Sequence, residues 1–279
     1  MHGNTGMKKI ETQVADHYGD SELLSRILDG LEASGLDRHN LQAANLAPVE
    51  EFHTGGKVAT EYAVAKMSLK ANQHVLDVGC GIGGTVRHIA EHKACQVTGI
   101  DLTPEYISAA KELSELTGFD HRVKFQVASA LDLPFQDMNF DAAISLHVAM
   151  NIHDRVSLYT EIARVLKSGA TFCLFDMMKK NSEALKYPVP WSQSIETSHL
   201  TTADEMLVLL DNAGFYVDEV EDRTEFALEF FKQNTSTAGP PPLGLHLVMG
   251  ESAAEKLQNT LWNLENGRIA PVQMLARRK

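Results

Sequence analysis

Apolar positions in the middle of the chain alternate between two periods, one typical of buried strands and one typical of helices that bury one face. Short apolar runs predict strands, expected at His74–Val78, Gln96–Asp101, Val123–Ala128, Phe140–Leu146 and Thr171–Asp176. Helical spacing between them predicts helices, expected at Thr85–Glu91, Pro104–Leu116 and Asp154–Leu166, with Thr103 as the N-cap of the second. This alternation indicates an α/β fold with a parallel sheet and helices on both faces.

The region before the first strand lacks this alternation. Residues 10–47 have apolar positions such as Leu23 and Ile27 at helical spacing. A loop with Pro48 and two glycines should separate them from a helix at Ala59–Ser68. The sequence therefore predicts an N-terminal helical segment that precedes the sheet.

The region after the fifth strand is less regular. The expected elements are helices at Thr202–Ala213, Thr224–Gln233 and Ala253–Glu265, and strands at Phe215–Val220 and Ala270–Arg277. The whole pattern indicates two parts: an N-terminal helical segment (1–68), and a core (69–279) with insertions around 179–200 and 221–269.

Composition narrows the function classes. The formal net charge is -12 and no basic run is present, so binding to nucleic acid or an anionic membrane surface is not expected. No apolar run approaches the roughly 20 residues of a membrane span. The three cysteines form no CxxC pattern, and the histidines show no metal-ligand spacing. We expect a cytoplasmic protein with reduced thiols and no metal; whether it forms homo-oligomers is left open.

The sequence VLDVGCGIGG (Val75–Gly84) carries the strongest chemical signal. Glycines directly after a buried strand allow a tight turn and let a ligand approach the backbone, and the next helix points free N–H groups at that ligand. Asp101 ends the second strand, about 20 residues after Gly79, where an acid can accept hydrogen bonds from ribose hydroxyls. This arrangement predicts an adenosine-containing ligand.

Two cofactor classes compete for the turn. The residues from Gly79 to Gly84 satisfy GxGxxG, which is typical of NAD-dependent oxidoreductases, but with Asp77 they also read DxGxGxG. The Asp77 carboxylate would repel a pyrophosphate and would suit the ammonium group of S-adenosylmethionine. An oxidoreductase would also need a second catalytic motif after this turn, such as YxxxK, and no YxxxK follows Gly84.

The motifs VLDVGCGIGG, VTGIDLTPEYI, ALDLPFQDMNFDAAIS and EIARVLKSGATFCLFD resemble class I S-adenosylmethionine-dependent methyltransferases. Within that family the chain is similar to the small-molecule type, such as ubiquinone/menaquinone, sterol and sarcosine/dimethylglycine methyltransferases. The resemblance implies a Rossmann-like, doubly wound, mostly parallel seven-stranded sheet with an N-terminal helical lid and helical insertions near the C-terminus.

The resemblance also implies site residues. Asp77, Gly79, Cys80 and Gly81 would bind the methionine end of S-adenosylmethionine, Asp101 its ribose, and Leu102, Ala130 and Leu131 its adenine. Ser129 departs from the family pattern, since an acid commonly stands there to receive the adenine amino group. His147 follows the fourth strand, where its backbone would lie near the methionine moiety.

Methyl transfer from a sulfonium is an in-line displacement, so the enzyme mainly aligns the acceptor and excludes water. A base is needed only where the acceptor must lose a proton, and His53 and His147 are the candidate catalytic residues. The candidate acceptor-binding residues are Tyr18, His53, Tyr187 and Trp191.

Several functions stay open on the sequence alone. We favour C- or O-methylation of a ring-containing small molecule, with N-methylation of a small amine such as a glycine derivative as the alternative. Two more distant alternatives are a non-catalytic binding protein on the same fold and an NAD-dependent oxidoreductase. For each site residue a structural role competes: His53 and Trp191, for example, could simply anchor loops.

Overall fold

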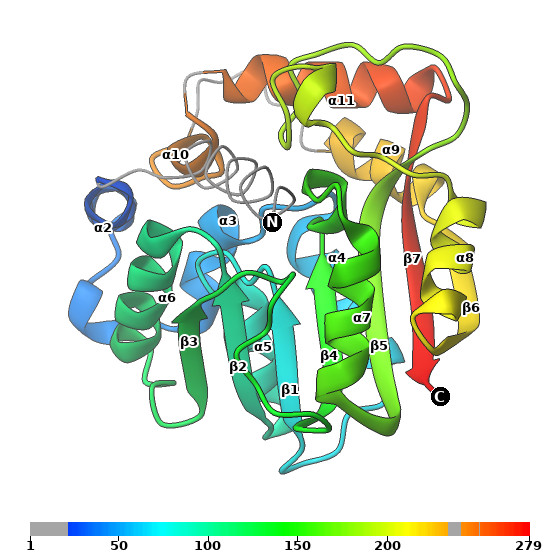
Figure 1. Cartoon of the computed structure of the whole chain (residues 1–279). Helices are drawn as coiled ribbons and strands as arrows, with labels where there is room; N and C mark the ends of the chain where they lie inside the picture. Colours follow the sequence, from blue (N-terminus) through cyan, green and yellow to red (C-terminus); the bar gives the residue numbers. More distant parts are fainter. Residues whose placement is uncertain (1–21, 234–240, 251) are drawn as a thin grey trace, which may run out of the picture.

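The computed structural model describes residues 22–233, 241–250 and 252–279. Seven strands form one sheet in the order β3-β2-β1-β4-β5-β7-β6 (Figure 1). Their bounds are β1 His74–Val78, β2 Gln96–Asp101, β3 Val123–Val127, β4 Phe140–Leu146, β5 Leu166–Lys179, β6 Phe215–Asp222 and β7 Ile269–Arg278. The pairs among β1 to β5 are parallel, and β7 runs antiparallel to both of its neighbours, β5 and β6. The predicted fold class is confirmed.

Helices cover both faces of the sheet. Their bounds are α2 Leu23–Ala33, α3 Ala47–Glu50, α4 Gly56–Lys66, α5 Gly84–Lys93, α6 Pro104–Leu116, α7 Arg155–Val165, α8 Ala203–Asn212, α9 Thr224–Gln233, α10 His246–Met249 and α11 Ala253–Glu265. Helices α4, α5 and α6 pack on one face of β1 and β2, and α7 and α8 pack on the other face of the sheet. From β1 the chain order runs outward in opposite directions, through β2 and β3 on one side and through β4 and β5 on the other. A ligand crevice is therefore expected beyond the carboxyl end of β1.

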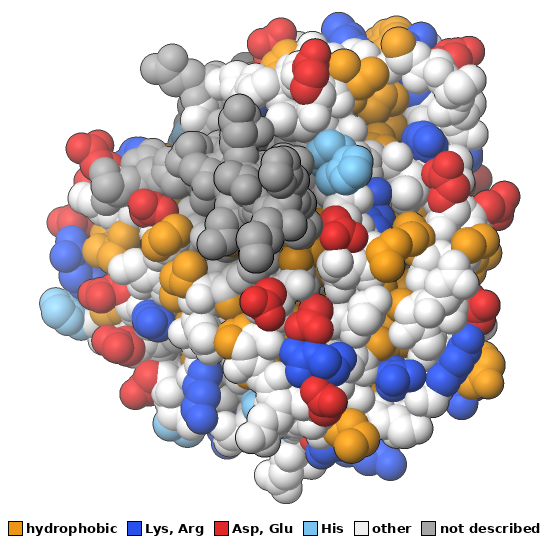
Figure 2. All heavy atoms as spheres, viewed as in Figure 1, with side chains coloured by type: hydrophobic (Ala, Val, Ile, Leu, Met, Phe, Trp, Pro, Cys, Tyr) orange, Lys and Arg blue, Asp and Glu red, His pale blue; other side chains and the backbone are white. Residues whose placement is uncertain are grey.

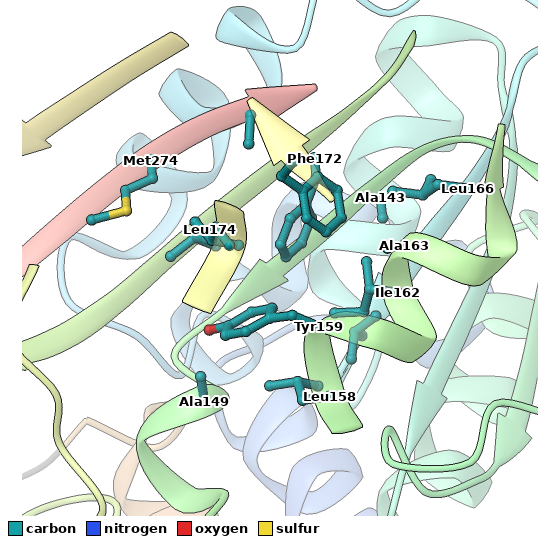
Figure 3. Close-up of a cluster of buried hydrophobic side chains, with 14 of the residues drawn as sticks. Ala143, Ala149, Leu158, Tyr159, Ile162, Ala163, Leu166, Phe172, Leu174 and Met274 are labelled. Atoms are coloured by element: carbon teal, nitrogen blue, oxygen red, sulfur yellow. The ribbon is translucent and has the colours of Figure 1, made fainter. Parts of the chain in front are cut away.

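The larger apolar core lies between α7 and the sheet. Leu158, Tyr159 and Ile162 of α7 face Phe172 and Leu174 of β5 (Figure 3). All five side chains are almost fully buried. This packing fixes α7 against β5, and so fixes the β4–α7 loop at the carboxyl edge of the sheet.

The N-terminal segment differs from the single helical stretch expected over residues 10–47, of which 10–21 lie outside the described residues. Helix α2 ends at Ala33, because Gly35 follows with φ +77° and closes the helix. Two short 3-10 turns and α3 come next. Pro48 does not break the pattern, since it lies in the first turn of α3, where a missing N–H costs nothing.

Helix α2 is held against the core. Leu23, Ile27 and Leu31 form its buried face, and they share a cluster with Tyr106 and Leu113 of α6. The apolar side of α2 therefore packs on α6, beside the cofactor-binding half of the sheet.

Other element ends shift for identifiable reasons. Strand β5 begins at Leu166, earlier than expected, because Leu166 already pairs with Phe140 before an irregular segment around Gly169. Thr103 stands at the N-cap position of α6, but its side chain makes no capping hydrogen bond. Asp101 accepts the Thr103 N–H instead.

Helices α9, α10 and α11 form a cap over the edge of the sheet at which the parallel strands end (Figure 1). On the face viewed in Figure 2, acidic and basic side chains are interspersed. No helix in the described ranges is long and apolar enough to cross a membrane.

Candidate active site

A cavity lies at the carboxyl ends of β1, β2 and β4, where the topology predicts a ligand. Six parts of the chain line it: the N-terminal segment, the glycine turn with β2, the loop after β3, the β4–α7 loop, the segment after β5 that holds Trp191, and the C-terminal cap. Every predicted cofactor-binding residue lines this cavity: Asp77, Gly79, Cys80, Gly81, Asp101, Leu102, Ser129, Ala130, Leu131 and His147. Their role in binding a cofactor stays a prediction, and the contacts of each residue show whether it could take that role.

The glycine turn is fixed by β2. The N–H groups of Gly79 and Cys80 both donate to the Ile100 carbonyl, each at 2.8 Å. Gly79 and Gly81 have φ +76° and +52°. A Cβ on Gly79 would lie 2.3 Å from Val148 Cγ2, whereas a Cβ on Gly81 would meet nothing within 4 Å. Gly79 is therefore needed for close packing against Val148, whereas Gly81 leaves the space beside the turn empty.

Asp77 is a buried acid without compensation. Its side chain is 2% exposed, and Oδ2 has no hydrogen-bond partner in the described part of the chain. Burial, together with the nearby carboxylates of Asp101 and Glu51, raises the pKa of Asp77 to about 8. A cationic group of a ligand would relieve both effects, so Asp77 fits the ammonium end of S-adenosylmethionine.

Asp101 holds the turn from the end of β2. Its Oδ2 accepts the Gly81 N–H at 3.0 Å and its Oδ1 accepts the Thr103 N–H at 2.9 Å. Burial raises the pKa of Asp101, and these backbone hydrogen bonds oppose that rise. Each carboxylate oxygen can accept a second hydrogen bond, so the ribose hydroxyls predicted here can still be bound.

The residues predicted for the adenine all line the cavity. Leu102, Ala130 and Leu131 supply apolar surface there. The Ser129 Oγ accepts the Leu131 N–H at 3.1 Å, so this hydroxyl shapes the loop that carries Ala130 and Leu131.

His53 and His147 come from distant segments and meet beside the cavity. Their ring centroids are 5.9 Å apart, and the His147 ring is 5.0 Å from that of Phe175. His147 has φ +56°, and its N–H donates to the Phe175 carbonyl at 2.7 Å. Burial lowers the pKa of His147 well below its usual value, and neighbouring His53 adds to this. His147 is thus a neutral imidazole in this site.

Sequence reasoning missed a carboxylate that holds His53. Glu51 Oε2 lies 3.0 Å from His53 Nε2, and Thr60 donates its hydroxyl to the same oxygen at 2.7 Å. Burial by itself raises the pKa of Glu51, but the hydrogen bonds from His53 and Thr60 outweigh it and hold the pKa below its usual range. The sequence places Glu51 two residues before His53, which could have suggested the pair. It gives no indication that Thr60 lies beside both side chains.

The predicted acceptor residues do not all reach the cavity. Trp191 lines it, is 3% exposed, and donates its Nε1–H to Ser198 Oγ at 3.0 Å. Tyr187 does not line it and packs in the cluster around Trp191. Tyr18 lies outside the described residues. His153 is exposed at the cavity rim, and its ring lies 5.2 Å from that of His199.

The cap supplies lining residues that the sequence did not single out. These are mostly apolar: Phe230, Phe231, Leu245, Met249, Leu257 and Thr260, with Phe52 from the N-terminal segment. In the described ranges, no three His, Cys, Asp or Glu side chains are grouped so as to hold a metal ion. The cavity therefore has a polar half around Asp77 and Asp101 and an apolar half under the cap.

A family model described as a methyltransferase domain matches residues 76–174, which include the glycine turn, Asp101 and His147. This part of the chain belongs to the class I S-adenosylmethionine-dependent methyltransferases. The resemblance seen in the motifs is confirmed. The methyltransferase domain holds β2, β3, β4, most of β1 and the first part of β5.

Curated relatives transfer methyl groups to different atoms. Ajmaline N-methyltransferase of Rauvolfia serpentina is 37% identical over 40% of this chain and 38% of its own length. O-methyltransferase resE of Aspergillus sclerotiorum is 33% identical over 60% of this chain and 65% of its own length. The chain thus spans less than two thirds of the length of these relatives.

A solved structure agrees in fold. Geranyl diphosphate C-methyltransferase from Streptomyces coelicolor A3(2), in complex with Mg²⁺, geranyl-S-thiolodiphosphate and S-adenosyl-L-homocysteine, has a TM-score of 0.71 and 17% identity. The match covers 97% of this chain and 98% of that one. At this identity the likeness concerns the fold alone.

Proposed function

We propose that this chain is an S-adenosylmethionine-dependent methyltransferase that acts on a small, largely apolar molecule. The observation that carries the proposal is the buried acid Asp77, which lines the cavity and whose Oδ2 has no hydrogen-bond partner in the described part of the chain. A buried charge of this kind is costly unless a ligand compensates it. The methyltransferase domain and its glycine turn support the same ligand.

The chain's own residues would divide the work. Asp77 would bind the ammonium group, Asp101 the ribose, and the apolar loop around Ala130 the adenine. The bound cofactor would supply an electrophilic methyl group on a sulfonium. The cap would exclude water from the transfer and hold the acceptor in line with that methyl.

The lining of the apolar half supports an acceptor with an apolar body. Aromatic side chains of Phe52, Trp191 and Phe230 suit a ring system. The Asp154 carboxylate, which also lines the cavity, would repel a phosphorylated acceptor. We therefore favour C- or O-methylation of a ring-containing metabolite, with His53 or His147 as the base where a proton must leave.

N-methylation remains the second candidate, because aromatic side chains also attract cationic amines and a 37% identical relative is an N-methyltransferase. The acidic residues at the cavity favour an amine without a carboxylate over a glycine derivative. The proposed site is otherwise the same for both reactions.

Calorimetry with S-adenosylhomocysteine and with NAD tests the cofactor. We expect saturable binding of S-adenosylhomocysteine and none of NAD. Incubation with cell extract and S-adenosylmethionine carrying a deuterated methyl group then tests the activity, because mass spectrometry detects labelled small-molecule products. Absence of S-adenosylhomocysteine binding would reject the proposed function.

A further inference from the structure

The segment between β5 and α8, residues 180–202, has little regular structure but contains a tight turn. The Val189 N–H donates to the Ser192 carbonyl at 2.8 Å, and the Ser192 N–H donates to the Val189 carbonyl at 3.1 Å. Pro190 and Trp191 form the tip of this turn, and both line the cavity. Long loops without their own helices or strands are uncommon in compact domains and are usually functional.

Helix α11 lies beside this segment and supplies the amide groups that hold it (Figure 1). Asn263 Oδ1 accepts the Lys186 N–H at 2.9 Å, and Asn263 Nδ2 donates to the Lys186 carbonyl at 2.9 Å. Four residues earlier on the helix, Asn259 Nδ2 donates to the Pro188 carbonyl at 2.9 Å. Both asparagines are almost fully buried. A side-chain amide has a donor and an acceptor, so Asn263 takes the place of a neighbouring strand.

The turn is also held on the side that follows Trp191. The Trp191 Nε1–H donates to Ser198 Oγ at 3.0 Å, and the next residue, His199, donates its N–H to the Met150 carbonyl at 2.9 Å. Met150 belongs to the β4–α7 loop and lines the cavity. The position of the Trp191 ring therefore depends on α11 at one end and on the β4–α7 loop at the other.

We propose that Asn259 and Asn263 are positioning residues for the acceptor, because they hold the Pro190–Trp191 turn as a wall of the apolar half of the cavity. This proposal rests on the proposed function, in which the apolar half takes the acceptor. Neither asparagine lines the cavity, so both act through the turn. Their loss should disturb the acceptor and leave the cofactor in the polar half.

The exposure of the held residues gives the direction of the effect. Lys186 is exposed, whereas Trp191 is 3% exposed. Without Asn263, the N–H and carbonyl of Lys186 lose their partners, and they can pair with water once the segment moves outward. Such a movement would draw Trp191 away from the acceptor.

Fluorescence of Trp191 tests the hold directly. The chain has two tryptophans, Trp191 and Trp262, so Trp191 alone reports in a Trp262→Phe background. Asn263→Ala should shift its emission to longer wavelength and make it easier for acrylamide to quench. Asn259→Ala should give a smaller change in the same direction, since it removes one hydrogen bond instead of two, and it provides the test if Asn263→Ala does not fold.

Asn266→Ala is the matched control. Asn266 lies at the exposed end of α11, and its Nδ2 donates to the Trp262 carbonyl of the same helix at 2.8 Å. Emission and quenching of Trp191 should stay unchanged in this variant. Unchanged fluorescence in both Asn263→Ala and Asn259→Ala would overturn the positioning role. An equal change in Asn266→Ala would overturn it too, because it would indicate a general loosening of α11.

Activity separates the acceptor from the cofactor. With dilute cell extract and S-adenosylmethionine carrying a deuterated methyl group, Asn263→Ala should form labelled product at least about tenfold more slowly, since a displaced wall misaligns the acceptor. Its Kd for S-adenosylhomocysteine in calorimetry should not change. A loss of S-adenosylhomocysteine binding that matches the loss of product would reject the assignment to the acceptor.

The two proposals fail in different measurements. An unmodified chain that does not bind S-adenosylhomocysteine would reject the proposed function. The fluorescence of Trp191 needs no ligand, so it decides whether the asparagines hold the turn in either case.

Discussion

At the scale of single residues, the glycines of the turn have separate tasks. Gly79 lies against Val148, so any side chain there would disturb the β4–α7 loop as well as a ligand. Gly81 has a positive φ but open space around its Cβ direction. A test of cofactor binding therefore belongs at Gly81, because a substitution at Gly79 would also displace packed atoms.

Gly81→Ala should weaken S-adenosylhomocysteine binding at least about tenfold while the chain stays folded. A non-glycine residue at this φ costs about 1 kcal/mol of stability, and the added methyl group would occupy the cofactor's space. Gly118→Ala is the matched control, with φ +75° and nothing within 4 Å of its Cβ. Equal binding by both variants in calorimetry would make the Gly81 turn structural only.

Asp77→Asn should separate stability from binding. The neutral amide removes a buried acid whose pKa is about 8, so the ligand-free protein should melt at a higher temperature above pH 8. The same change removes the charge that would meet the ammonium group, a loss of roughly 1.5–3 kcal/mol in binding. Thermal melts with and without S-adenosylhomocysteine measure both effects. A higher melting point together with unchanged affinity would place the ligand ammonium elsewhere.

At the scale of elements, the N-terminal segment divides into a fixed and a site-facing part. Helix α2 packs on α6, whereas Glu50, Phe52, His53 and Thr54 line the cavity. Glu50 also pairs with the fully buried Arg87 of α5, and Arg87 donates to the Ile82 carbonyl of the glycine turn at 2.8 Å. A structural change at the glycine turn can therefore be transmitted through Arg87 to Glu50 and the residues beside it.

Hydrogen exchange tests the predicted lid, expected from the sequence over residues 1–68. On adding S-adenosylhomocysteine, exchange should slow across residues 50–56, because closure over the cofactor protects their amides. Exchange within α2 should change little, since its apolar face is already buried on α6. Identical exchange of residues 50–56 in both states would indicate a permanently docked segment.

The elements show what a sequence can and cannot provide. Strands β1 and β2, which hold Asp77 and Asp101, are predicted well because short runs of mostly apolar or β-branched residues end at a glycine or an acid, which local patterns reveal. The acceptor side is predicted poorly, since Phe230 and Phe231 look like one face of an amphipathic helix. Only the folded cap brings that helix to the cavity that His147 also lines. The partnership of Glu51 with His53 likewise depends on Thr60, which lies one helical turn into α4.

At the scale of the whole molecule, buried acids should make stability depend on pH. The pKa of Asp77 is about 8, against 3.8 for the unfolded chain, so the folded protein binds more protons in this window and loses stability as the pH rises. Between pH 7 and 9 the expected loss is about 1 kcal/mol. Buried histidines with lowered pKa values act in the opposite sense, but only below about pH 6.5.

Urea unfolding at pH 7 and pH 9 measures this loss. Asp77→Asn should remove most of the difference between the two pH values, whereas Asp204→Asn on the exposed start of α8 should keep it. A pH dependence that persists in Asp77→Asn would show that another group is responsible.

The position of β7 between β5 and β6 has a consequence for biosynthesis. Strand β6 leaves the ribosome well before β7, yet it joins the sheet only through β7. Until residues 269–278 emerge, β5 is an open edge on the nascent chain, and open edges invite pairing with other chains. Release of the chain after Gly267 should therefore yield aggregated protein, and a soluble, monodisperse product in gel filtration would contradict this. Translation speed over the α9–α11 cap would then set how long the growing chain needs protection by chaperones.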